Sequence, residues 1–94
     1  MPKCFEIYGY IVFFWSNESD PIEPVHVHVG KQISSNCTKI WILSDGSTEV
    51  ENNNSRIPSR DLNRILATIE AYSYYIVDKW ERYFGVKAVY KDLR

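Results

Sequence analysis

The sequence predicts an α+β domain, in which a four- to five-stranded antiparallel or mixed sheet carries one long amphipathic C-terminal helix on one face. Two observations predict this class. Residues 3–51 contain short runs rich in β-branched and aromatic residues that are separated by turn signals, which is typical of strands. From Ser59 to Phe84, apolar residues instead recur at three- and four-residue intervals, which is typical of an amphipathic helix.

The expected strands differ in how much of their surface is apolar. Residues 10–15 and 39–43 are apolar on both faces, which favours central positions in the sheet. Residues 48–51 fit a short edge strand whose two glutamates face solvent while Val50 faces inward. The complete set of expected strands is 3–7, 10–15, 25–29, 39–43 and 48–51.

The helix has clear boundaries. Ser59 is the expected N-cap, and Gly85 is a fitting C-terminal stop. At about 1.5 Å per residue the helix would run nearly 40 Å, which is long for so small a sheet, so we also consider a break near Tyr72-Ser73. Residues 86–90 fit a last strand or a strand-like tail. The stripe expected in the core consists of Leu62, Ile65, Leu66, Ile69, Tyr72, Ile76, Val77, Trp80 and Phe84.

Length and composition indicate one domain spanning residues 1–94. An apolar fraction of 45% is ordinary for a globular protein. The net charge of −1 argues against nucleic-acid binding by bulk charge, although a local basic patch is compatible with it. Cys4 and Cys37 lack metal-binding spacing, and without a signal peptide we expect reduced thiols in a cytoplasmic protein. No segment has the length of a membrane span.

Both histidines fall in the segment 25–29, Val-His-Val-His-Val, which follows an acidic loop. Alternation in a strand places the valines on one face, expected to be core, and His26 and His28 on the other. Three interpretations stay open. The histidines are solvent-face residues, or they form a catalytic site with Glu18, Asp20 or Glu23 as the orienting carboxylate, or they bind a divalent metal with one of those carboxylates.

Two further sets of residues are candidates for binding. Arg60 and Arg64 share a helix face by their four-residue spacing and, near Arg56, could hold phosphate; a solvated helix face is the plainer interpretation. Tyr74, Tyr75 and Tyr83 could cover a partner, although most helical aromatic residues are core. The second apolar face of the sheet also needs a cover, which self-association or a partner protein would supply.

Several motifs together resemble one family. The N-terminal Met1-Pro2-Lys3, the later Ser16-Asn17-Glu18, the histidine segment and the helix end at Trp80-Glu81 are similar to small bacterial proteins grouped as domain of unknown function 4160. The resemblance covers residues 1–85, which leaves 86–94 as an extension. The loop here is lengthened by Ile22-Glu23, and Val25 separates Pro24 from the first histidine, which departs from the usual pattern.

The resemblance implies a protein encoded beside another small domain in a toxin–antitoxin-like pair. From it we expect an interaction component that binds a cognate small protein. The alternative is a small hydrolase, in particular a nuclease, with His26 and His28 as acid/base or metal-binding residues and Arg60 or Arg64 on phosphate. No cofactor is expected beyond the divalent ion that this alternative allows.

Overall fold

The computed structural model describes residues 2–15 and 23–94. Within these ranges, five strands form a single antiparallel sheet in which each strand lies beside its neighbours in sequence, in the order β1-β2-β3-β4-β5. The expectation was four to five strands in an antiparallel or mixed sheet, and the structure has five strands, all antiparallel. The strands are β1 (Lys3–Ile7), β2 (Tyr10–Phe13), β3 (His26–Gly30), β4 (Thr38–Ile42) and β5 (Thr48–Asn52).

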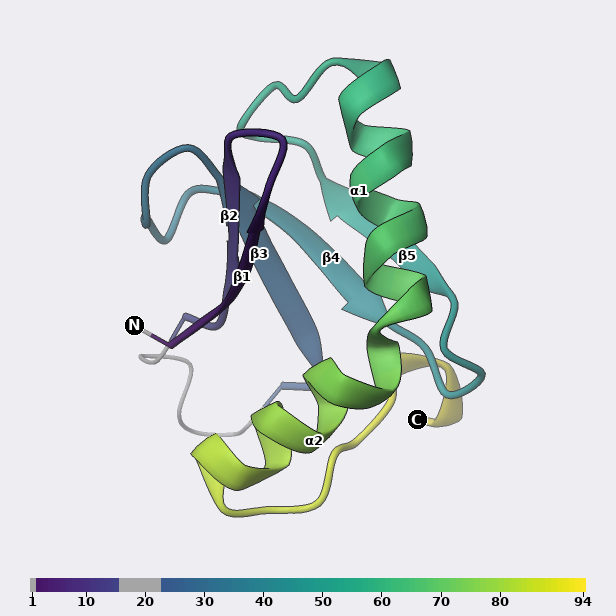
Figure 1. Cartoon of the computed structure of the whole chain (residues 1–94). Helices are drawn as coiled ribbons and strands as arrows, with labels where there is room; N and C mark the ends of the chain where they lie inside the picture. The colour runs from purple at the N-terminus through teal and green to yellow at the C-terminus, as the bar shows by residue number, and fades with distance from the viewer. Residues whose placement is uncertain (1, 16–22) are drawn as a thin grey trace.

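The single long helix that the sequence predicts is instead two helices, α1 (Ser59–Ala71) and α2 (Ser73–Phe84). The backbone of Tyr72 leaves helical geometry, with φ −110° and ψ 18°, and α2 then turns across the end of the sheet (Figure 1). The largest dimension of the molecule is 32 Å, so a straight helix of about 39 Å would extend beyond the sheet. The break keeps the apolar sides of both helices on the core.

The helix ends agree only in part with expectation. Pro58 occupies the N-cap position and Ser59 is the first helical residue, so the expected Ser59 cap is wrong and no side-chain cap hydrogen bond forms. At the other end Gly85 adopts a left-handed conformation, with φ 71°, and its N–H donates to the Glu81 carbonyl at 2.8 Å. Glycine adopts this conformation without steric cost, which is why it terminates α2.

The helices cover the valine face of the sheet. Val25, Val27 and Val29 are completely buried in one cluster with residues of both helices, as the alternation predicts. Tyr72 is an exception, because it lies in the break and 58% of its surface is exposed, whereas the stripe placed it in the core. The helical members that are buried in the cluster are Ile65, Ile69, Ile76 and Trp80.

The segment 86–90 forms no strand, and the chain ends in a short 3₁₀ helix, η1 (Lys91–Leu93). The tail nevertheless contacts the sheet: the N–H of Val25 donates to the Val89 carbonyl at 2.8 Å, and the hydroxyl of Ser44 donates to Asp92 at 2.6 Å. The extension thus holds the chain just before β3. No helix among the described residues is long and apolar enough to cross a membrane.

Both cysteines are buried free thiols. Cys37 lies against Gly30 at the end of β3, where a Cβ added to the glycine would come within 2.5 Å of the Cys37 Sγ and 3.1 Å of the Ser55 hydroxyl oxygen. This close approach requires glycine at position 30.

We therefore expect Gly30→Ala to destabilise the protein by about 1–3 kcal/mol through overpacking. Urea denaturation of Gly30→Ala, Cys37→Ala and the double variant measures this. Because Cys37→Ala removes the sulfur atom, the glycine substitution should cost less in the double variant. Equal costs in both backgrounds would contradict the proposed clash.

Candidate functional site

The two histidines lie in a row of aromatic rings on the face of the sheet away from the helices. Their strand, β3, pairs with β2 and β4, which places Phe13 opposite His28 and Trp41 opposite His26. Ring centroids are 5.8 Å apart for Phe13 and His28, 5.2 Å for the two histidines, and 5.3 Å for His26 and Trp41. The structure thus brings the two histidines together as predicted from their spacing.

The histidines are not solvent-face residues. Only 5% of His26 and 3% of His28 is exposed, and Phe13 and Trp41 are buried beside them. The interpretation of the histidines as solvent-face residues is therefore wrong. Four side chains at the centre of this second face are therefore buried in the structure.

A hydrogen bond fixes the orientation of His26. Its Nδ1 lies 2.8 Å from the backbone carbonyl oxygen of Pro24. A carbonyl oxygen can only accept, so Nδ1 donates, and in the neutral ring Nε2 is then an acceptor. This hydrogen bond ties the imidazole to the backbone just before its own strand.

Charged residues lie around the buried side chain of Trp41. The indole N–H donates to Glu51 at 2.8 Å, and the Lys39 Nζ lies 4.5 Å from the centre of the ring. Lys39 in turn forms an ion pair with Glu23 at 2.6 Å, and Lys91 of η1 forms one with Glu49. Sequence reasoning missed Lys39, Glu51 and Lys91 at this site. Alternation along β4 puts Lys39 and Trp41 on one face, and this signal could have identified Lys39 from the sequence.

Of the three carboxylates expected to orient the histidines, the structure describes only Glu23. Glu18 and Asp20 lie outside the described residues, and Glu23 binds Lys39. Within the described part of the chain, no group of three or more His, Cys, Asp or Glu side chains could hold a metal ion. The row of four rings packs β2, β3 and β4 together, and the imidazole nitrogens lie among aromatic rings.

Arg60 and Arg64 are remote from the histidines. Both are exposed on α1, which packs on the valine face, so the sheet separates them from the imidazoles. The guanidinium carbon of Arg64 instead lies 4.7 Å from the ring centre of Tyr8 in the β1–β2 turn. The structure therefore does not assemble the two histidines and two arginines into one site.

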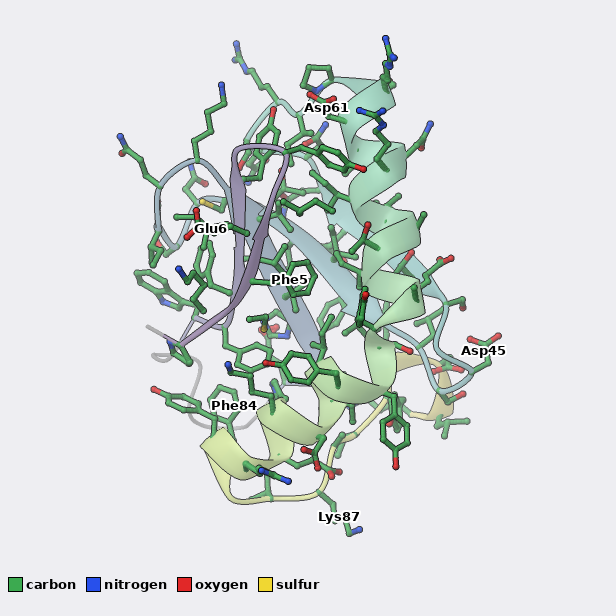
Figure 2. All side chains as sticks on the ribbon, in the orientation of Figure 1. Phe5, Glu6, Asp45, Asp61, Phe84 and Lys87 are labelled. Carbon is green, nitrogen blue, oxygen red and sulfur yellow. The ribbon has the colours of Figure 1, made fainter. Side chains whose placement is uncertain are left out.

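A second feature lies on the helix side, between β1 and the helix break. It is an apolar pocket of about 460 Å³, and Phe5 points from β1 toward α1 while Glu6 points the other way (Figure 2). Cys4 also lines this pocket. Burial raises the pKa of its thiol from the usual 9.0 to about 12, an effect partly offset by the nearby Lys79 cation. The other lining residues are Ile7, Thr68, Tyr72 and Tyr75.

A protein-family model described as Domain of unknown function (DUF4160) matches residues 9–81. The chain belongs to this family. The match includes all four rings of the aromatic row and both helices as far as Glu81, so the DUF4160 region contains the sheet centre and its cover. No curated protein and no solved structure matches the chain. The DUF4160 description leaves the function uncharacterised, as we expected for this sequence.

We expect His28→Ala to lower the free energy of unfolding by about 2–4 kcal/mol, because it leaves a cavity beside Phe13. Urea denaturation followed by tryptophan fluorescence measures this change. Asn63→Ala, on the exposed side of α1, is the matched control and should stay within about 0.5 kcal/mol. A His28→Ala value as small as the control's would mean that the imidazole does not support the sheet.

We expect Cys4 to resist thiol reagents in the folded protein. In a Cys37→Ala background at pH 8, Ellman's reagent should detect no thiol until guanidinium unfolds the chain. Because the thiol pKa is higher in the folded state, Cys4 contributes stability that is present below pH 9.0 and is lost as the pH rises toward 12. The stability difference from Cys4→Ala should shrink over that range.

Proposed function

We propose that this DUF4160 protein is the interaction component of a toxin–antitoxin-like pair and binds a cognate small protein through the helix side of the fold. The resemblance to small paired bacterial proteins motivates the pairing. The single observation that supports the binding surface is a strip of exposed tyrosines along the helix break and α2. We call it the tyrosine strip, and it consists of Tyr72, Tyr75 and Tyr83 with Lys79 between them.

The tyrosine strip is one continuous helical edge. Tyr75, Lys79 and Tyr83 recur at four-residue intervals, so their side chains follow one another along α2. The Lys79 Nζ lies 5.8 Å from the Tyr75 ring centre, and the rings of Tyr75 and Tyr83 are about half exposed. Tyrosine is enriched at interfaces because its ring buries apolar area and its hydroxyl stays hydrogen-bonded. The strip therefore has the composition of an interface core.

The apolar pocket gives this surface a place for an anchoring side chain. Tyr72 and Tyr75 belong to both the pocket and the tyrosine strip. β1 forms the other wall, and within the described residues it is an edge strand bonded only to β2. An apolar side chain of the partner would enter the pocket while the tyrosine rings close around it, as interface anchors commonly do.

The hydrolase alternative has weaker support. It needs a substrate to reach His26 and His28, which are almost completely buried, and it needs arginines that lie across the sheet. Glu18, the third catalytic candidate, lies outside the described residues. RNA integrity in cells that express the chain tests the alternative. Degradation with the wild type but not with His26→Ala/His28→Ala would support a nuclease.

We expect Tyr75→Ser/Tyr83→Ser to weaken binding to the product of the neighbouring gene about 100-fold, if each ring contributes about 1.4 kcal/mol. Isothermal titration calorimetry of the purified proteins measures this. Tyr74→Ser is the control, because Tyr74 is the most exposed tyrosine, at 89%, yet lies on another side of α2. It should bind like the wild type.

Two outcomes would overturn the proposal. The first is that the two wild-type proteins form no complex. The second is that the double variant and Tyr74→Ser bind equally well, which would place the interface elsewhere. Circular dichroism of each variant confirms that the fold is kept, which is expected for side chains at the surface.

A further inference from the structure

One end of the molecule gathers cations from three separate segments. Lys31 follows β3, Arg56 precedes α1, and Arg60 and Arg64 lie on the first turns of α1; all four are exposed. We call these four residues together with Tyr8 the basic surface. Figure 2 shows nitrogen-tipped side chains projecting from the end of the molecule where Asp61 is labelled.

Contacts in the fold join these segments. Gly30, next to Lys31, approaches Ser55, next to Arg56, because the Ser55 hydroxyl donates to the Val29 carbonyl at 2.8 Å. Tyr8 sits in the two-residue turn between Ile7 and Tyr10, and Arg64 lies over its ring. The cations therefore lie at the same end of the molecule, and one of them, Arg64, contacts the exposed ring of Tyr8.

The charges of the basic surface are not neutralised within the described chain. None of its four cations forms an ion pair with a described carboxylate, whereas Lys3, Lys39, Arg82 and Lys91 each do. Asp61 lies in the first turn of α1 without bonding to any of them. The positive end of the α1 dipole adds to the same field. Such a surface attracts a polyanion.

The backbone is strained at two positions of this surface. Tyr8, with φ 52°, and Arg56, with φ 55°, are the non-glycine residues of the described chain that have a positive φ. Each such residue costs roughly 1 kcal/mol or more, and strain of this kind clusters at functional sites. The turn formed by Tyr8 and Gly9 (φ 80°) favours asparagine at its first position. A tyrosine there is unfavourable for the turn, but it places an aromatic ring among the cations.

We infer that the basic surface binds single-stranded nucleic acid, with Lys31, Arg56, Arg60 and Arg64 on phosphates and Tyr8 stacked on a base. Exposed aromatic rings between cations suit single strands, because their bases are free to stack and every base has a flat face. An acidic polypeptide would satisfy the cations but would leave the ring without a stacking partner. This inference goes beyond the proposed protein partner, which occupies the tyrosine strip on α2.

Fluorescence anisotropy with a fluorescein-labelled 12-residue oligouridylate tests the inference on the full chain. Four phosphate contacts predict that the logarithm of affinity falls with the logarithm of salt concentration with a slope of about −3. Arg60→Gln/Arg64→Gln should halve this slope and weaken binding at least about tenfold at low salt. Arg82→Gln/Lys87→Gln, which removes two cations from the other end, is the matched control and should bind like the wild type.

Tyr8→Asn separates base stacking from charge. Asparagine suits the turn, so the fold should keep its melting temperature, while affinity for oligouridylate falls at least about fivefold. Affinity for an abasic 12-residue strand should not change, because that strand has phosphates but no bases.

Three results would overturn the inference. They are no binding of oligouridylate, equal loss in the Arg82→Gln/Lys87→Gln control, and polyglutamate binding as tight as oligouridylate binding. The last result would assign the surface to an acidic polypeptide instead. Because the tyrosine-strip variants are not used here, the result does not depend on the protein–protein proposal.

Discussion

Burial of β3 on both faces is the constraint on which the rest of the structure depends. Its valines fill the core under the helices, while its histidines lie in the aromatic row on the other face. A strand buried on both faces must be central, so β2 and β4 lie on either side of it and supply Phe13 and Trp41. Polar imidazoles in such a position must be oriented by neighbours, as the Pro24 carbonyl orients His26.

Because the histidines are buried, the accessible candidate binding sites lie on the outer surfaces of the molecule. Both the tyrosine strip and the basic surface lie on the helix side or the ends of the fold, where side chains are accessible. They also have different chemistry, because the tyrosine strip is aromatic with one cation, Lys79, while the basic surface has four cations and one aromatic ring. The break at Tyr72 separates them by giving α1 and α2 different directions (Figure 1). A small fold thereby presents two independent surfaces.

Local pattern predicts the strands, the turns and the valine core, because alternation and turn chemistry are properties of neighbouring residues. The order of the strands also follows from short connections. The helix break does not follow from the periodicity, since the apolar stripe continues through Tyr72, and only the length of the sheet limits the helix. The aromatic contacts of the histidines were missed for a related reason: Phe13 and Trp41 reach them only through pairing across strands. The Arg64–Tyr8 contact likewise joins residues 56 positions apart, which no local pattern reveals.

The neighbour-to-neighbour order of the sheet has a consequence for folding kinetics. Each strand pairs with the strand next to it in sequence, so the hairpins close shorter loops than the contacts between the sheet and α2 do. The contacts that join the most distant parts of the chain are those that α2 and the C-terminal tail make with the sheet and its ends. Docking of α2 and the tail, rather than pairing of the strands, therefore closes the longest loops, and we expect it to limit the folding rate.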